Sequence, residues 1–269
     1  MLEKGFYHMD CMDGMKEFPD GFFDLAIVDP PYGINVTGRH KAGKIVGGGS
    51  RPFGGRGTGV KCTLVAGGYS GCGGVDSKKY HTFDDTQPPD KTYFDELRRV
   101  SKRQIIWGGN FFLDYLGAAS CMIVWDKRRR GLDQADCEIA WTNLPGQNRL
   151  FEFRWNGMLQ GNMKDKEERI HPTQKPVALY AWLLGQYAKD GDKILDTHVG
   201  SASSLIACHR AGLDYWGFEK DETFWRDATE RLEREKNQIN IFQLMAEDFI
   251  NETEQGVHSE QNQMVGNGA

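Results

Sequence analysis

A short motif of polar and aromatic residues directly follows the apolar stretch at residues 25–28. It consists of Asp29, Pro30, Pro31 and Tyr32. Two consecutive prolines cannot extend a strand, so they predict a rigid, extended turn. In such a turn Asp29 and the Pro30 carbonyl can each accept one hydrogen of an amino group, while Tyr32 stacks on the ring that carries it. We therefore expect Asp29, Pro30, Pro31 and Tyr32 to be the catalytic residues, acting on a planar ligand with an exocyclic amine.

A second group of small and polar residues, 196–204, links a predicted strand to a predicted helix. A strand, a turn of small residues and a helix N-terminus together suit a nucleotide or a carboxylate. The strand that follows ends in Glu219, roughly twenty residues further on, where an acid can bind both hydroxyls of a ribose. A generic strand-turn-helix of a Rossmann-like fold is the alternative interpretation of this segment.

Together these segments resemble the S-adenosylmethionine-dependent DNA methyltransferases that act on exocyclic amines. Asp29–Tyr32 is similar to their catalytic tetrapeptide, and residues 196–204 are similar to their methionine-binding turn. The segment His171–Pro176, with the sequence HPTQKP, is similar to the one that precedes that turn in one subgroup. The catalytic motif comes before the cofactor motif, an order that resembles the class called beta. The resemblance extends from about Phe6 to Glu235.

The resemblance implies a set of residues that bind the cofactor S-adenosylmethionine. Glu219 would bind the ribose, Phe218 or Lys220 would flank the adenine, and Lys175 would favour the methionine carboxylate. Two residues depart from the family pattern: His198 stands where Phe is usual, and Ala202 stands where Gly is usual. The full expected set is Asp10, Cys11, Thr173, Lys175, Asp196, His198, Gly200, Ser201, Ser203, Phe218, Glu219 and Lys220.

The implied reaction is site-specific methylation of the exocyclic amine of adenine in DNA, with the base flipped out of the duplex. The corresponding amine of cytosine is the alternative acceptor. Methylation of a ring carbon of cytosine would need a cysteine beside a proline, and none of the six cysteines follows a proline. There are two weaker alternatives. One is a nicotinamide-dependent oxidoreductase, although this sequence lacks the Gly-x-Gly-x-x-Gly pattern of such enzymes. The other is a DNA-binding relative that has lost catalysis.

Apolar strands alternate with helical patterns along the chain, which predicts a doubly wound α/β fold. The resemblance implies a Rossmann-like, mostly parallel, seven-stranded sheet with helices on both faces, in one catalytic domain at residues 1–250. A tail at 251–269 is expected to be disordered. The expected strands are 6–9, 25–29, 104–108, 121–125, 137–142, 150–155, 193–196 and 215–219, and the expected helices are 91–99, 110–116, 176–189, 201–211 and 222–235.

The charge is unevenly distributed along the 269 residues, whose formal net charge is −5. Residues 33–80 contain eight bases, one acid and 15 of the 33 glycines, which predicts a long basic loop after the catalytic motif. We expect this loop and segments within 127–170 to contact DNA phosphates. The residues expected to bind DNA are Arg39, Lys41, Lys44, Arg51, Arg56, Lys127, Arg128, Arg129 and Arg130.

The sequence also sets expectations about location and partners. It contains neither a run of about 20 apolar residues nor a signal peptide, so we expect a cytoplasmic protein without a membrane partner. Double-stranded DNA is the expected partner, and a second copy of the chain and a cognate restriction endonuclease are further candidates. We expect no metal site, because His40, Cys62, Cys72 and His81 match no spacing of zinc ligands.

Overall fold

The computed structural model of the protein describes residues 1–34, 81, 85–130, 135–156, 159–164 and 166–238. Most of the expected basic loop lies outside the described residues, and so do Arg39, Lys41, Lys44, Arg51, Arg56 and the tail at 251–269. Within the described ranges, no helix combines the length and the apolar character needed to cross a bilayer.

The core of the fold is an eight-stranded sheet in the order β1-β10-β9-β2-β3-β5-β4-β6. All neighbouring strands pair in parallel except β5, which is antiparallel to both β3 and β4. This confirms the expected mostly parallel α/β sheet, which has eight strands where the resemblance implied seven; the edge strand β6, beside β4, corresponds to the expected strand 150–155. The strands are β1 (Gly5–His8), β2 (Leu25–Val28), β3 (Gln104–Trp107), β4 (Met122–Asp126), β5 (Cys137–Thr142), β6 (Arg149–Glu152), β9 (Lys193–Asp196) and β10 (Asp214–Glu219), while β7 (Trp155–Asn156) and β8 (Leu159–Gln160) form a separate pair.

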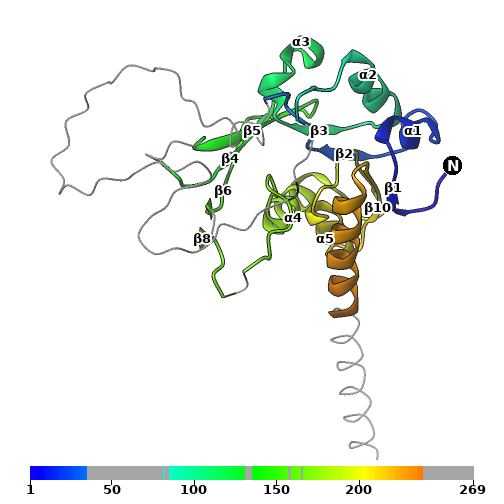
Figure 1. The fold of residues 1–269 in the computed structure, drawn as a ribbon. Helices are drawn as coiled ribbons and strands as arrows, with labels where there is room; N and C mark the ends of the chain where they lie inside the picture. Colours follow the sequence, from blue (N-terminus) through cyan, green and yellow to red (C-terminus); the bar gives the residue numbers. More distant parts are fainter. Residues whose placement is uncertain (35–80, 82–84, 131–134, 157–158, 165, 239–269) are drawn as a thin grey trace, which may run out of the picture.

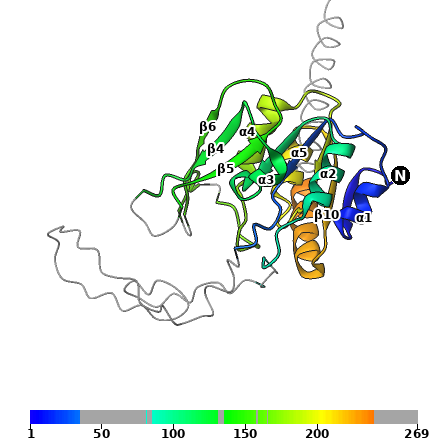
Figure 2. The same ribbon diagram turned by 90° about the horizontal axis from the view of Figure 1, so that it is seen from above.

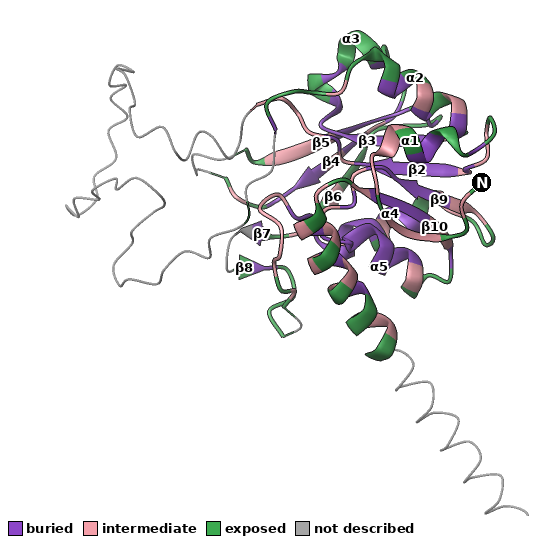
Figure 3. Ribbon diagram, turned by 45° about the vertical axis from the view of Figure 1, so that its right-hand side comes forward, coloured by how far each residue is buried: buried purple, intermediate pink, exposed green. Residues whose placement is uncertain are grey.

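Helices cover both faces of the sheet (Figure 1). One face carries α1 (Cys11–Lys16), α2 (Lys91–Val100), α3 (Leu113–Leu116) and the 3-10 turn η1 (Gly109–Phe111). The other face carries α4 (Val177–Tyr187), α5 (Ser203–Arg210) and a helix at residues 222–238. Each face has its own hydrophobic core, and the central strands between them are almost wholly buried (Figure 3).

Local sequence signals explain the elements that hold this sandwich together. All four residues of β2, Leu25–Val28, are buried, as expected for a strand covered on both faces. At the start of α2 the Asp90 side chain accepts hydrogen bonds from the backbone N–H groups of Thr92 and Tyr93. Tyr93, Phe94, Leu97 and Val100 recur at helical spacing and form the buried side of α2.

Three expected helices have different bounds in the structure. The stretch 110–116 is divided into η1 and α3, with Phe112 between them. Pro176 is extended and precedes α4 rather than forming its first turn. Ala202 has a left-handed backbone, with φ +60°, so α5 begins at Ser203, two residues later than expected.

The chain reverses its winding direction between β9 and β2, which are neighbours in the sheet. From β9 the chain passes through α5 to β10 on one side, whereas from β2 it passes through α2 to β3 on the other. Figure 2 shows β4, β5 and β6 at the end of the sheet away from α1. In open α/β sheets, ligands bind at the carboxyl edge of such a switch point.

Candidate active site

Four acidic residues stand at the carboxyl ends of four neighbouring parallel strands. Asp10 follows β1, Glu219 ends β10, Asp196 ends β9 and Asp29 follows β2. Because these strands run in parallel, all four residues lie at one edge of the sheet, around the switch point. The structure therefore brings together the two motifs that are 167 positions apart at Asp29 and Asp196.

The carboxylate of Asp29 is bound on both oxygens. Oδ1 accepts a hydrogen bond of 2.6 Å from the Tyr32 hydroxyl, and Oδ2 accepts one from Lys175 Nζ. The Lys175 ammonium also lies 3.3 Å from the Tyr32 hydroxyl oxygen. Burial raises the pKa of Tyr32 well above its ordinary value, so this residue stays a hydrogen-bond donor. The expected catalytic residues Asp29 and Tyr32 are thus joined directly.

The ring of Tyr32 is fixed by residues at the end of β3. It stacks on Phe111 with 5.0 Å between ring centroids and 20° between planes, and it meets Phe112 edge-on. Gly108 has φ +67°, and a Cβ atom there would lie 2.2 Å from Tyr32 Cε1. The glycine therefore allows both the turn and the close approach of the ring.

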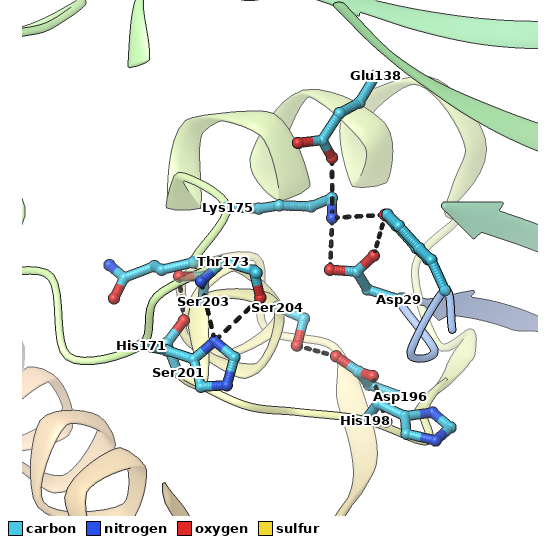
Figure 4. A network of polar contacts seen from close by, with 12 residues as sticks. Asp29, Glu138, His171, Thr173, Lys175, Asp196, His198, Ser201, Ser203 and Ser204 are labelled. Carbon is cyan, nitrogen blue, oxygen red and sulfur yellow. Dashed lines mark hydrogen bonds and ion pairs between the residues drawn. The ribbon is translucent and has the colours of Figure 1, made fainter. Parts of the chain in front are cut away.

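Lys175 lies between two carboxylates of the protein, and its expected contact with a methionine carboxylate stays a prediction. Its side chain is 3% exposed, and its Nζ lies between Asp29 and Glu138 (Figure 4). Burial lowers the pKa of Lys175, but the two carboxylates outweigh this effect and hold the pKa above its ordinary value. A buried ammonium needs paired anions, and Asp29 and Glu138 supply two.

Glu138 was not expected in the site. It lies near the start of β5, which is antiparallel and therefore begins at the edge where the other strands end. Its Oε1 accepts a hydrogen bond from Lys127, and its Oε2 lies 3.0 Å from Lys175 Nζ. Burial raises the pKa of Glu138, but Lys175 and Lys127 outweigh this and lower it. The only sequence signal was a lone acid in the otherwise uncharged stretch of residues 137–142.

The basic run at residues 127–130 is largely bound to acidic neighbours. Lys127 is 9% exposed and pairs with Glu138, so it is not the solvated side chain that a phosphate contact requires. Arg128 pairs with Glu152, and Arg130 pairs with Asp126. DNA binding by Arg128, Arg129 and Arg130 stays a prediction, whereas burial argues against that role for Lys127.

The expected cofactor turn closes onto Glu219. The backbone N–H of Gly200 donates to Glu219 Oε2 at 2.8 Å, with Gly200 at φ +57°. Asp196 accepts hydrogen bonds from the His198 backbone N–H at 3.0 Å and from the Ser204 hydroxyl. Burial raises the pKa of Asp196 to about 7 and also raises that of Glu219. The structure therefore places Asp196, His198, Gly200 and Glu219 together.

Two serines of the same turn are held from outside it. Ser201 and Ser203 are buried, and their hydroxyl oxygens are 3.1 Å apart. Arg231, from the helix at 222–238, donates to the Ser201 carbonyl at 2.6 Å and to Ser203 Oγ at 2.9 Å. Arg231 also pairs with Glu167 at 2.8 Å. Sequence reasoning did not find Arg231, whose place becomes apparent only when the helix packs against the turn.

The remaining expected cofactor residues have different environments. Phe218 has no exposed surface and packs on α1, where a Cβ at Gly14 would lie 2.5 Å from its ring. Side chains alternate along β10, so Phe218 faces away from the side of Glu219, which favours Lys220 of the two residues expected to flank the adenine; that contact stays a prediction. Lys220 is exposed and pairs with Asp10 at 3.3 Å. Burial raises the pKa of the Cys11 thiol to about 12, so this thiol stays protonated.

The segment before α4 lies against the cofactor turn. A Cβ at Gly200 would be 3.7 Å from the ring of His171, and the Thr173 hydroxyl lies 3.1 Å from His171 Nδ1. Burial lowers the pKa of His171 to about 3 and that of His198 to about 4, so both rings are neutral near pH 7. The expected residues Thr173 and His198 therefore lie at this edge of the sheet, and the His198 ring is uncharged there.

Comparisons with known proteins identify a family for most of this chain, from the residues before α2 to the helix at 222–238. The sequence model of the DNA methylase family N6_N4_Mtase matches residues 75–230. The chain is 35% identical over 86 residues to the type II methyltransferase M2.DpnII of Streptococcus pneumoniae. This matched segment covers 32% of this chain and 31% of that protein. It is 34% identical over 73 residues to the type II methyltransferase M.HpaI of Haemophilus parainfluenzae, covering 27% and 23%. The matched segments thus span less than a third of either relative.

Solved structures with a similar course of the chain include a complex of M1.HpyAVI with SAM and the cytosine-N4-specific PvuII DNA methyltransferase. The first has a TM-score of 0.48 and 16% identity, covering 84% of this chain and 98% of that one. The second has a TM-score of 0.48 and 11% identity, covering 89% and 93%. The family match at residues 75–230 extends over more than half of the chain. The protein belongs to the N6_N4 DNA methylase family.

Proposed function

We propose that this protein transfers a methyl group from S-adenosylmethionine to the exocyclic amine of adenine in double-stranded DNA. The observation that carries the proposal is the position of Asp29, which follows β2 directly beside the turn at Asp196 and Gly200. Family membership supports DNA methylation in general. The choice of adenine rests on Asp at the first position of the tetrapeptide, where the methyltransferases of cytosine amines more often have Ser.

The residues at the ends of β9 and β10 fit a nucleoside linked to an amino acid. Glu219 is a partly buried acid at the position where a ribose diol is bound in Rossmann-like folds. Asp10 and Lys220 lie beside it with exposed side chains that can contact a base. Gly200 has a positive φ and brings backbone, rather than a side chain, to the turn. When bound here, S-adenosylmethionine supplies an electrophilic methyl group.

Asp29 and Pro30 would prepare the acceptor nitrogen. The lone pair of an adenine amine is delocalised into the ring, which makes it a poor nucleophile. If the Asp29 carboxylate and the Pro30 carbonyl each accept one N–H bond, they draw the nitrogen towards tetrahedral geometry and localise its lone pair. The nitrogen would then attack the methyl carbon in line while the bond from that carbon to sulfur breaks, leaving the thioether S-adenosylhomocysteine, and the methylated amine would afterwards lose a proton to solvent. Positioning and electrostatics supply the rate, without a covalent intermediate on the protein.

Tyr32 would receive the flipped base. Its ring offers a stacking surface that replaces part of the stacking lost when the base leaves the duplex. Because its hydroxyl is bonded to Asp29, the ring and the carboxylate have a fixed relative position. This link would place the amino group of a stacked base at the carboxylate.

The test is to incubate the protein with unmethylated genomic DNA and S-adenosylmethionine labelled in its methyl group, and then to digest the DNA to nucleosides. We expect the label in N6-methyldeoxyadenosine. Asp29→Ala should abolish transfer while calorimetry shows unchanged cofactor binding, and Asp95→Ala, at an exposed acid on α2, is the matched control. Label only in N4-methyldeoxycytidine would support the alternative acceptor, and label in neither would overturn the proposal. Tight binding of a nicotinamide dinucleotide in place of S-adenosylmethionine would also contradict it.

A further inference from the structure

Four side chains of alternating charge form a row that begins at the expected catalytic residue Asp29. They are Asp29, Lys175, Glu138 and Lys127, and each is paired with the next. The two lysine side chains are nearly buried, at 3% and 11% exposure. Removing charges from water is costly unless they are paired. Each charged side chain of this series must therefore still have an oppositely charged neighbour when one of them changes partner.

The pairing within this series is unequal. Lys175 donates hydrogen bonds to Asp29 Oδ2 and to the Tyr32 hydroxyl oxygen. Glu138 Oε1 accepts from Lys127. Glu138 Oε2 is buried, and its partner within the described part of the chain is the Lys175 ammonium, whose Nζ lies 3.0 Å away. The Lys175 ammonium is therefore shared between the carboxylates of Asp29 and Glu138, and it can shift towards either one without leaving the pocket.

The ammonium of Lys175 and the amine of a bound base would compete at Asp29. Both are nitrogen donors that require the same carboxylate. In addition, the amine nitrogen becomes positive as the methyl bond forms, so an ammonium held on the same carboxylate would oppose the reaction. A lysine that moved to a second anion would relieve this opposition and would remain paired.

We propose that Glu138 is a positioning residue that receives the Lys175 ammonium when the base amine binds Asp29. This inference rests on the proposed function and assigns to Glu138 a role in its reaction. Before the base arrives, Lys175 holds Asp29 in place. When the amine takes its position, the ammonium shifts its hydrogen bond to Glu138 Oε2, which already lies within 3.0 Å. No charge leaves the pocket in this exchange.

Glu138→Gln tests the exchange, because it keeps the shape of the side chain but removes the charge that attracts Lys175. We expect single-turnover methylation near pH 7 to fall about tenfold or more, with little change in KM for DNA and in cofactor binding. Glu138→Asp should recover part of the loss. Glu235→Gln is the control, since Glu235 is also mostly buried and paired with a base, Arg210.

The pH dependence of the methylation rate distinguishes the exchange from a purely structural role of Glu138, which would leave that dependence unchanged. The charged and titratable groups around Lys175 are Asp29, Glu138, Tyr32, Lys127 and His171. Losing the Glu138 charge lowers the pKa of Lys175, so in Glu138→Gln the lysine should lose its proton at a lower pH and release Asp29. The tenfold deficit should therefore shrink as pH rises towards 9, while the control keeps the wild-type profile.

A double-mutant cycle with Lys175→Met decides the matter. If Glu138 acts by drawing Lys175 away, then Glu138→Gln should not lower the rate of methylation any further in a protein that already carries Lys175→Met. The double variant also keeps the charges of the pocket balanced, because it loses one acid and one base. Additive losses, or a Glu138→Gln protein with wild-type rate, would overturn the exchange alone. A wild-type chain that transfers no methyl group to DNA would instead overturn the proposed function, and the exchange with it.

Discussion

The ring of Tyr32 lies so close to Gly108 that a single added methyl group would come within 2.2 Å of Tyr32 Cε1. Gly108 follows β3, and Tyr32 follows β2 by four residues, so this contact fixes the tetrapeptide relative to the neighbouring strand. The position of Asp29 depends on the same contact, because the Tyr32 hydroxyl donates to its carboxylate.

Gly108→Ala should displace Tyr32 and reduce methylation at least tenfold, while cofactor binding stays unchanged. Gly117→Ala is the matched control, because Gly117 has a similar positive φ of +75° but nothing within 4 Å of an added Cβ. Both variants should lose about 1–3 kcal/mol of unfolding free energy from backbone strain, because each glycine has a conformation that residues with a Cβ atom rarely adopt. Equal activities of the two variants would contradict the role of the Tyr32 contact.

Phe111→Ala should weaken the binding of the flipped base. Phe111 stacks on Tyr32 yet is 47% exposed, so it extends the aromatic surface of the site towards solvent. Loss of one stacking surface costs about 1–3 kcal/mol per base, which corresponds to roughly a tenfold or larger rise in KM for DNA. Steady-state kinetics would measure it, and Leu113→Ala, at a residue exposed to 53%, is the control. A change in kcat alone would argue against this role.

Sequence reasoning located Asp29, Asp196 and Glu219 because each belongs to a local motif at a strand end. The parallel sheet then brings such ends together without further information. The partner of Lys175 could not be found in this way. Glu138 reaches the site only because β5 is inserted antiparallel between β3 and β4, and that placement depends on the whole sheet.

Phe218 and Lys127 have surroundings that the sequence did not indicate. Each lies at or directly after the end of a strand, where ligands bind in such sheets, and that position alone suggested a contact with a ligand. In a strand, however, neighbouring side chains point to opposite faces. Phe218 consequently fills the core on the α1 side, and Lys127 turns inward to Glu138.

Asp196→Asn should stabilise the protein increasingly as pH rises. Folded Asp196 keeps its proton up to a pKa of about 7 because it is buried, whereas the ordinary value is 3.8. The folded state therefore binds more protons between these values, and its stability falls as pH rises from about 4 to 7. Over that range the loss amounts to at most about 4 kcal/mol.

The asparagine variant does not titrate in this range, so its advantage over wild type should grow between pH 4.5 and pH 7.5. Denaturant unfolding at several pH values would measure the difference. Asp95→Asn, at an exposed carboxylate, should show no such trend. A constant difference between Asp196→Asn and wild type across the range would contradict the raised pKa.

Arg231→Met should separate the stability of the fold from the affinity of the cofactor turn. The Arg231 side chain is 11% exposed, and it binds the Ser201 carbonyl, Ser203 Oγ and Glu167. Removing it leaves Glu167 buried without its counterion, which costs about 3–5 kcal/mol. It also frees the turn, so S-adenosylmethionine should bind about tenfold more weakly by calorimetry.

Two further variants show which part of the loss belongs to the turn. Arg234→Met removes a neighbouring arginine whose pair with Glu168 is longer, at 3.8 Å, and exposed, so it should change stability by less than about 1 kcal/mol. Adding Glu167→Gln to Arg231→Met removes the unpaired charge, while the Gln carbonyl can still accept from the backbone N–H of Val177. Stability should then recover, but cofactor affinity should not, because Ser201 and Ser203 still lack their donor. If affinity recovered together with stability, Arg231 would support the fold as a whole rather than the turn.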